Sequence, residues 1–313
     1  MAETVVIAIG GNAILKEGQV GTVEEQLANV DSACGPIVDL YAKGFRIILV
    51  HGNGPQVGNI LLQVEAAADT VAPQTIDLAG AQTQGQLGYM IQRSVHNHFT
   101  RRGVAGKITS VVTQVIVDAR DPAFQNPTKP IGPFYTQQRA EELHRLNPQQ
   151  VFREDAGRGW RRVVPSPRPI RIIERDSVRS LLDQNHIVVA GGGGGIPVAV
   201  EGDHYVGMEA VVDKDLVSAA IARDLNADKL IILTGVPQVY VDFGTPNQRP
   251  IRRMSAEEAK GYLEEGQFPP GSMMPKIQAA LEYLENGGKE VVITSIDQLA
   301  QAAEGKTGTV IYA

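Results

Sequence analysis

Three short apolar runs, each followed by a glycine-rich segment, constrain the fold of this 313-residue chain more than any other feature. The runs and the glycine-rich segments after them are 4–9 with 10–13, 46–50 with 51–58, and 187–190 with 191–195. Near-continuous apolar runs of this length are typical of strands that are buried on both faces of a parallel sheet. Because ligands bind at the carboxyl ends of such strands, the three glycine segments are predicted to lie on one edge of the sheet.

Composition agrees with an α/β protein. The chain has 33 glycines and 43 % hydrophobic residues but only 5 % aromatic residues, which argues against a β-sandwich or a disordered chain. A net charge of -6 argues against a general nucleic-acid-binding protein. The single cysteine, Cys34, cannot form an intramolecular disulfide, and no apolar run is long enough to span a membrane. We therefore expect a cytoplasmic protein that binds neither nucleic acid nor membranes.

The remaining pattern alternates helices and strands. Thr22 and Glu25 form a capping box that predicts a helix start, and Gly35-Pro36 is expected to kink or break that helix. Ser255 and Glu258 predict a second capped helix. Periodicity predicts further helices at 83–102, 175–183, 214–225 and just after Pro275, strands at 108–118, 229–233, 290–294 and 309–312, and a hairpin at 198–206.

An unusual segment interrupts this order between about residues 118 and 170. It contains eight of the chain's 18 prolines and many arginines, and its one clear helical pattern spans 136–146. Proline-rich segments of this kind are typical of stiffened loops. We interpret the segment as an inserted subdomain or lid.

Three lysines in loop or helix-start positions suggest the chemistry: Lys129 in the insert, Lys214 and Lys276. Lys214 precedes Asp215 at the mouth of a helix, where backbone N–H groups also attract anions. A simpler interpretation of each lysine is a solvated surface charge, with a neighbouring aspartate that only caps the helix. Phosphoryl transfer, however, requires mainly positioning and positive charge, which glycine loops and several lysines supply.

Other site classes are weaker. Gly305-Lys306-Thr307 imitates the end of a P-loop but lacks its first glycine, and Gly52-Asn53-Gly54 departs from the dinucleotide fingerprint at its third position. The six histidines are scattered, which argues against a zinc site held by the protein. His51, beside the second glycine segment, remains open as either a structural residue or a base.

Motifs along essentially the whole chain resemble those of carbamate kinases, a branch of the amino acid kinase family. The two motifs in the insert are the most specific, because they are similar to the protruding subdomain of carbamate kinases. The matching segments are 10–13, 51–58, 126–133, 154–161, 192–197, 212–215, 233–236 and 271–276.

This resemblance implies an open three-layer αβα sandwich with a mainly parallel central sheet and an inserted protruding subdomain. It implies a homodimer that transfers a phosphoryl group reversibly between ATP and carbamate, giving ADP and carbamoyl phosphate, with Mg²⁺ carried mainly by the nucleotide. In cells the family usually works towards ATP in arginine or related catabolism. We expect residues 1–212 to form the acceptor lobe, with the lid at about 118–170, and residues 213–313 to form the nucleotide lobe.

The resemblance also assigns roles to residues. Lys129, Lys214 and Lys276 would neutralise the transferring group, and Asp215 would orient Lys214 and Lys276. The residues expected to hold the acceptor and the phosphoryl group are Gly10, Gly11, Asn12, Gly52 and Asn53, with Gly191, Gly192 and Gly193 at the junction of the two halves. The residues expected to border the nucleotide are Asp213, Leu233, Thr234, Gly235, Val236 and Met274.

Two alternatives remain. A related kinase could form the acyl phosphate of a larger carboxylate; the insert discriminates, because we expect it to close over a pocket too small for acetylglutamate. A non-catalytic nucleotide or amino-acid sensor could share the fold, although the presence of the lysines argues against it. A nicotinamide-dependent oxidoreductase is the least favoured alternative.

Overall fold

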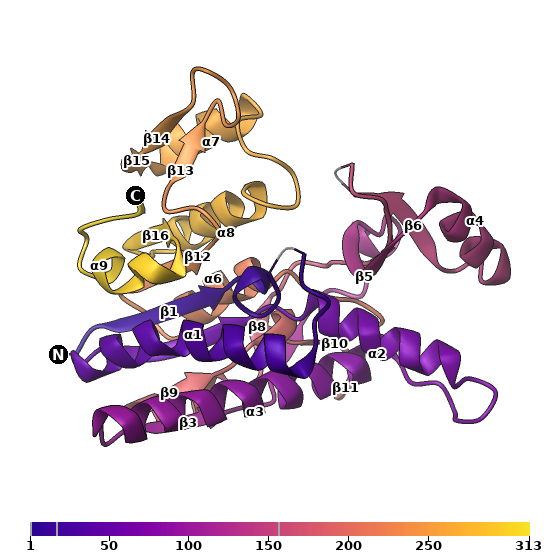
Figure 1. Ribbon diagram of the computed structural model, residues 1–313, viewed down its shortest axis with the longest axis horizontal. Helices are drawn as coiled ribbons and strands as arrows, with labels where there is room; N and C mark the ends of the chain where they lie inside the picture. Colours follow the sequence, from indigo (N-terminus) through magenta and orange to yellow (C-terminus); the bar gives the residue numbers. More distant parts are fainter. Residues whose placement is uncertain (1, 17, 156) are drawn as a thin grey trace.

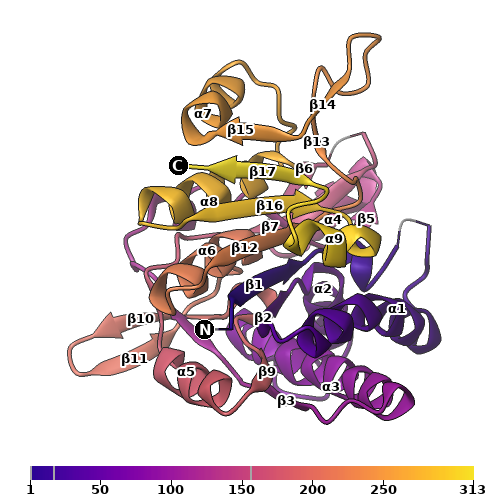
Figure 2. The ribbon, with the colours of Figure 1, turned by 90° about the vertical axis from the view of Figure 1, so that its left-hand side faces the viewer.

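The computed structural model describes residues 2–16, 18–155 and 157–313, and an eight-stranded sheet runs through it with helices on both faces (Figures 1 and 2). All neighbouring strands of this sheet are parallel except one antiparallel pair, β16 and β17. The strand order is β15 (Arg253–Ser255), β17 (Thr309–Tyr312), β16 (Glu290–Thr294), β12 (Lys229–Leu233), β1 (Thr4–Ile9), β2 (Arg46–His51), β9 (His186–Val189) and β3 (Lys107–Ser110).

The predicted three-layer α/β fold is confirmed by two core clusters on opposite faces of this sheet. Alternate residues of β1 enter different clusters: Val6 and Ala8 face one side, whereas Val5 and Ile7 face the other. One cluster packs under α5 (Arg175–Asp183), α6 (Lys214–Asp224), α7 (Ala256–Glu264) and α8 (Met274–Glu285). The other packs under α1 (Val23–Ala42), α3 (Ile76–Arg102) and α9 (Leu299–Ala303).

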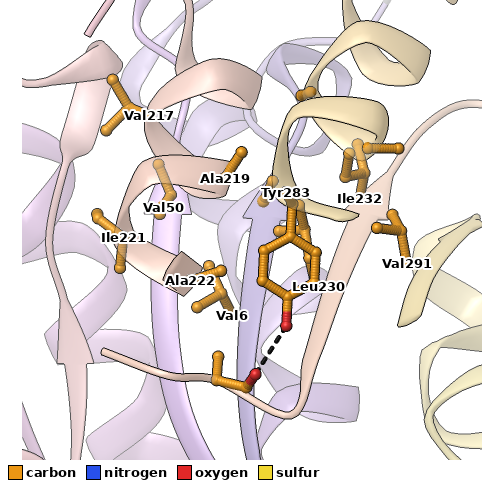
Figure 3. Packing of buried hydrophobic residues seen from close by; sticks show 14 of the residues in the cluster. Val6, Val50, Val217, Ala219, Ile221, Ala222, Leu230, Ile232, Tyr283 and Val291 are labelled. Carbon is orange, nitrogen blue, oxygen red and sulfur yellow. Dashed lines mark hydrogen bonds between the residues drawn. The ribbon is translucent and has the colours of Figure 1, made fainter. Parts of the chain in front are cut away.

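The core cluster beneath α6 and α8 holds both helices against the sheet. Figure 3 shows Val217 and Ile221 of α6 beside Val50 of β2, and Tyr283 of α8 against Leu230 of β12. The Tyr283 hydroxyl donates to the Ala227 carbonyl oxygen at 2.7 Å, which ties α8 to the loop between α6 and β12.

Several predicted helix boundaries are confirmed. Both capping boxes are present, Thr22 with Glu25 at α1 and Ser255 with Glu258 at α7. The hairpin predicted at 198–206 is formed by β10 (Ile196–Glu201) and β11 (His204–Gly207). These strands belong to a smaller sheet with the order β11, β10, β4 (Gln114–Ile116) and β8 (Arg171–Ile172).

Three predictions about local structure were wrong. The helix α1 continues through Gly35-Pro36 without a break. Proline removes one helix hydrogen bond there, and Arg102 Nη1 donates to the adjacent Gly35 carbonyl oxygen at 2.8 Å, which ties this part of α1 to α3. The helix predicted at 83–102 begins at Ile76, and the strand predicted at 108–118 is two strands in different sheets, β3 and β4.

The insert was also misjudged as mostly stiffened loops. It contains a three-stranded antiparallel sheet with the order β5 (Lys129–Tyr135), β7 (Trp160–Val164) and β6 (Val151–Glu154), and it projects from the main body with its helix α4 (Gln137–Leu146) (Figure 1). Proline is tolerated in the edge strand β5, where it needs to donate no ladder hydrogen bond. The insert docks on α2 (Gly54–Ala66), where a Cβ on Gly58 would lie 2.0 Å from Gly132 Cα.

Candidate functional site

Two cavities of about 680 and 760 Å³ open beside the carboxyl ends of β1 and β2 and meet between the main body and the insert. The first also reaches the end of β12 and the start of α8, through Leu233, Thr234, Gly235 and Lys276. The second extends from the loop after β2 to the insert, through Gly52, Asn53 and Gly193. Among the described residues, four line both cavities: Gly11, Lys129, Arg158 and Lys214.

A buried charge cluster lies where the two cavities meet. Asp215, with only 4 % of its side chain exposed, accepts from Lys214 Nζ at 2.5 Å and from Lys276 Nζ at 3.0 Å on its two carboxylate oxygens. Burial acts to raise the pKa of Asp215, but the charges of Lys214 and Lys276 outweigh it and hold that pKa below its usual range. Burial lowers the pKa of Lys214, and the neighbouring Asp215 opposes this shift.

Asp213 links this cluster to the insert. Its Oδ1 accepts from the backbone N–H of Asp215 at 2.8 Å, so Asp213 is the N-cap of α6, and its Oδ2 accepts from Lys129 Nζ of β5. Burial acts to raise the pKa of Asp213, but the Lys129 charge contributes to a net lowering.

The simpler interpretation of Lys214 as a solvated helix-start residue is wrong, because its side chain is 13 % exposed and is held by a buried carboxylate.

The structure brings most of the candidate residues together. Those that line one or both cavities are Gly10, Gly11, Gly52, Asn53, Gly193, Lys129, Asp213, Lys214, Asp215, Leu233, Thr234, Gly235 and Lys276. Four candidates do not line either cavity: Gly191, Gly192, Val236 and Met274, the last of which packs against the core. The side chain of Asn12 lies outside the described part of the structure, as does Ala156 of the motif 154–161.

The matching family model describes the amino acid kinase family and covers residues 3–295 of this chain. The chain belongs to the amino acid kinase family. A carbamate kinase of Pyrococcus horikoshii is 46 % identical over 311 residues, with 99 % of each chain covered. A carbamate kinase-like protein, YahI, of Escherichia coli is 46 % identical over 312 residues, covering 99 % of this chain and 98 % of that protein.

Solved structures agree with this family assignment. A carbamate kinase from Giardia lamblia bound to AMP-PNP superposes with a TM-score of 0.92 at 42 % identity, covering 99 % of this chain and 98 % of that chain. The family match and these relatives identify the chain as a phosphotransferase.

In this amino acid kinase, the glycines of 191–195 pack closely against the residues that follow β2, behind the site. A Cβ on Gly192 would lie 2.3 Å from His51 Nε2, and a Cβ on Gly193 would lie 2.2 Å from Asn53 Nδ2. Glycine lets this turn press directly on the loop after β2. The glycines at 191 and 192 therefore shape the wall from behind, which explains why they do not line the cavities.

Two supporting residues on α3 were missed by the sequence analysis. Thr83 Oγ1 accepts from Asn53 Nδ2 at 2.8 Å, and Gln84 Nε2 donates to the carbonyl oxygens of Thr113 and Gly192 at 3.0 and 2.9 Å. Both side chains are fully or almost fully buried. A polar residue on the buried face of a helix indicates a hydrogen bond to another element, but the sequence does not show which residue is its partner.

His51 is a structural residue in this arrangement. Its side chain is 1 % exposed, it lines neither cavity, and its Nδ1 lies 3.1 Å from the Gly52 carbonyl oxygen. Because a carbonyl oxygen can only accept, Nδ1 carries the proton of the neutral ring. Burial lowers the pKa of His51 to about 4, against which the Gly52 bond acts only weakly.

This buried neutral imidazole predicts a loss of stability in acid. The unfolded chain binds a proton at an ordinary histidine pKa near 6.5, whereas the folded chain binds it only near pH 4. Stability should therefore fall as pH drops from 6.5 to 4, by about 3 kcal/mol from this residue. Urea unfolding between pH 7.5 and 4.5 measures it. In His51→Gln the free energy of unfolding should depend less steeply on pH. The same pH dependence in the variant and the wild type would contradict the prediction.

Proposed function

We propose that the chain is a carbamate kinase, which transfers a phosphoryl group reversibly between ATP and carbamate and gives ADP and carbamoyl phosphate. The observation that carries this proposal is the group of three lysines, Lys129, Lys214 and Lys276, at the meeting point of two cavities. The carbamate kinases of Pyrococcus horikoshii and Giardia lamblia, each matched along nearly its whole length, support this choice of substrate.

The proposed mechanism is electrostatic. The nucleotide occupies the cavity beside Leu233, Thr234 and Gly235, and the acceptor occupies the cavity beside Gly52 and Asn53. Lys214 and Lys276 neutralise the oxygens of the transferring group, and Asp215 holds both ammonium groups in place. Carbamate already carries an ionised nucleophilic oxygen, so we expect that the reaction needs no general base. In line with this, His51 lines neither cavity.

Mg²⁺ is proposed to travel with the nucleotide phosphates, whose charge it neutralises when bound. The carboxylates of Asp213 and Asp215 are already engaged by lysines and by a backbone N–H. Within residues 2–16, 18–155 and 157–313, no group of three or more His, Cys, Asp or Glu side chains could hold a metal ion. Phosphate oxygens and water are therefore the fitting ligands.

The lobes and the assembly are part of the same proposal. Residues 1–212 would hold the acceptor, with the insert at about 118–170 as the lid, and residues 213–313 would hold the nucleotide.

A homodimer would cover the exposed apolar side chains Leu78 and Tyr89 of α3 and Tyr205 of β11. These elements adjoin, because a Cβ on Gly207 would lie 2.1 Å from Asp77 Oδ2. Sedimentation velocity would test the assembly.

The cellular setting is proposed from the resemblance alone: a cytoplasmic enzyme that works towards ATP in arginine or related catabolism. In the part of the chain that the structure describes, no helix is long and apolar enough to cross a membrane.

A larger acceptor is the main competing proposal. We expected a pocket too small for acetylglutamate, but the acceptor cavity has a volume of about 760 Å³, much more than carbamate needs. ADP formation from ATP and Mg²⁺ separates the two. We expect activity with carbamate, which forms in ammonium bicarbonate solutions, and none with acetate or N-acetylglutamate. Activity with N-acetylglutamate but not with carbamate would replace the proposed substrate; binding of ATP with no turnover would favour the sensor.

A further inference from the structure

Arg158, at the tip of the hairpin between β6 and β7, has no role in the function proposed so far. It lines both cavities, a property that it shares only with Gly11, Lys129 and Lys214 among the described residues. Its side chain is 55 % exposed, so its guanidinium group is open to a ligand in the cleft. Resting on the proposed carbamate kinase reaction, we propose that Arg158 binds the phosphate oxygens of the acyl phosphate and is a further substrate-binding residue.

The surroundings of Arg158 orient it without neutralising it. Its Cζ lies 4.9 Å from the centre of the Phe134 ring, and Arg161 Cζ lies 5.1 Å from the same centre. Asp155 lies 3.3 Å from both guanidinium groups, one on each carboxylate oxygen. Two arginines thus share the carboxylate of Asp155, so Asp155 alone does not neutralise both guanidinium groups.

The guanidinium group of Arg161 is less available to a ligand than that of Arg158. Its side chain is only 15 % exposed, and its Nε donates to the Gly132 carbonyl oxygen at 3.1 Å, so it fixes β7 to β5. Among the residues that the structure describes, the Arg158 guanidinium group donates to Asp155 alone, at 3.3 Å, and its remaining N–H donors can meet another acceptor. The fork of a guanidinium group matches two phosphate oxygens at once.

The charge balance of the cleft leaves a place for such a group. Lys129, Lys214 and Lys276 are matched by two carboxylates, Asp213 and Asp215, so the lysine cluster retains one net positive charge. An acyl phosphate and a nucleoside diphosphate together bring several negative charges. Arg158 would add a cation from the insert side, opposite the cation pair held by α6 and α8.

Arg158→Gln is the variant that tests the proposal, and Arg153→Gln is its matched control. Arg153 is an exposed arginine of the same subdomain that donates to Asn126 Oδ1 and lines neither cavity. In ATP formation we expect Arg158→Gln to raise the KM for carbamoyl phosphate by about tenfold or more, with the KM for ADP within about twofold. Arg158→Lys should recover part of the loss, and Arg153→Gln should match the wild type.

A second measurement separates this proposal from the proposed reaction. Trp160, the chain's only tryptophan, lies two residues from Arg158, so its fluorescence reports on the hairpin. Titration with inorganic pyrophosphate should change this fluorescence saturably in the wild type and in Arg153→Gln, and at least about tenfold more weakly in Arg158→Gln. This holds even if carbamoyl phosphate proves not to be the substrate. Equal pyrophosphate affinity in all three proteins, or an equal rise in both KM values, would overturn the role of Arg158.

Discussion

The Lys214→Ala variant is expected to turn over at least about 100-fold more slowly than the wild-type chain. Lys214 lines both cavities, and the 2.5 Å bond to Asp215 fixes its ammonium group where they meet. A fixed cation stabilises the charge that develops on the transferring group without reorganisation. The loss should therefore fall mainly on kcat, because the interaction is made most strongly in the transition state.

Folding should survive this change. Asp215 keeps its bond to Lys276 at 3.0 Å in the variant, so its buried charge remains paired. Lys260→Ala is the control, since Lys260 pairs with Glu285 on the surface and lines neither cavity. The thermal midpoints and ADP affinities of the wild type and the two variants should be similar. A kcat for Lys214→Ala within about threefold of the wild type would remove Lys214 from the mechanism.

Gly194→Ala is expected to lower the free energy of unfolding by more than about 3 kcal/mol. The φ angle of Gly194 is +91°, which an alanine adopts only with strain, and a Cβ would lie 2.0 Å from the Val212 carbonyl oxygen. The obstructing atom belongs to the backbone, so no side-chain movement can relieve the overlap. Since Val212 directly precedes the N-cap Asp213, the displacement should also disturb the start of α6 and reduce activity.

Gly261→Ala is the matched control for this prediction. Gly261 lies within α7, and a Cβ there would meet no atom within 4 Å. An alanine at a position of this kind usually stabilises a helix by about 0.5–1 kcal/mol. Urea unfolding of both variants measures the contrast. If Gly194→Ala proved as stable as Gly261→Ala, the close contact between Gly194 and the Val212 carbonyl oxygen would be contradicted.

The strands and their glycine turns could be predicted because short-range patterns determine them. Buried parallel strands need continuous apolar runs, and the turns after β1, β2 and β9 need glycine, so both leave a local signature. Lys214 could be placed at a helix start for the same reason. That Asp215 also binds Lys276 could be stated only through the family resemblance, because Lys276 lies 61 residues from Asp215 in the chain.

What local patterns could not supply were contacts between distant elements. The helix α1 continues through Pro36, and Arg102 of α3 binds the adjacent Gly35 carbonyl oxygen, a contact that no pattern near Pro36 indicates. The strand β5 was missed because it contains two prolines, which are unfavourable in most strands but tolerated at a sheet edge. Arg158 was overlooked because a surface arginine has no signature until the hairpin is folded against the cleft.

ATP formation from carbamoyl phosphate, ADP and Mg²⁺ is the measurement that tests the central claim most directly. The purified chain would be assayed beside Lys214→Ala, with acetyl phosphate as a second donor. We predict that the wild type forms ATP from carbamoyl phosphate with a clear preference over acetyl phosphate, and that Lys214→Ala loses at least about 99 % of this activity. No ATP from carbamoyl phosphate, under conditions in which ADP still binds, would contradict the assignment of this site as a carbamate kinase.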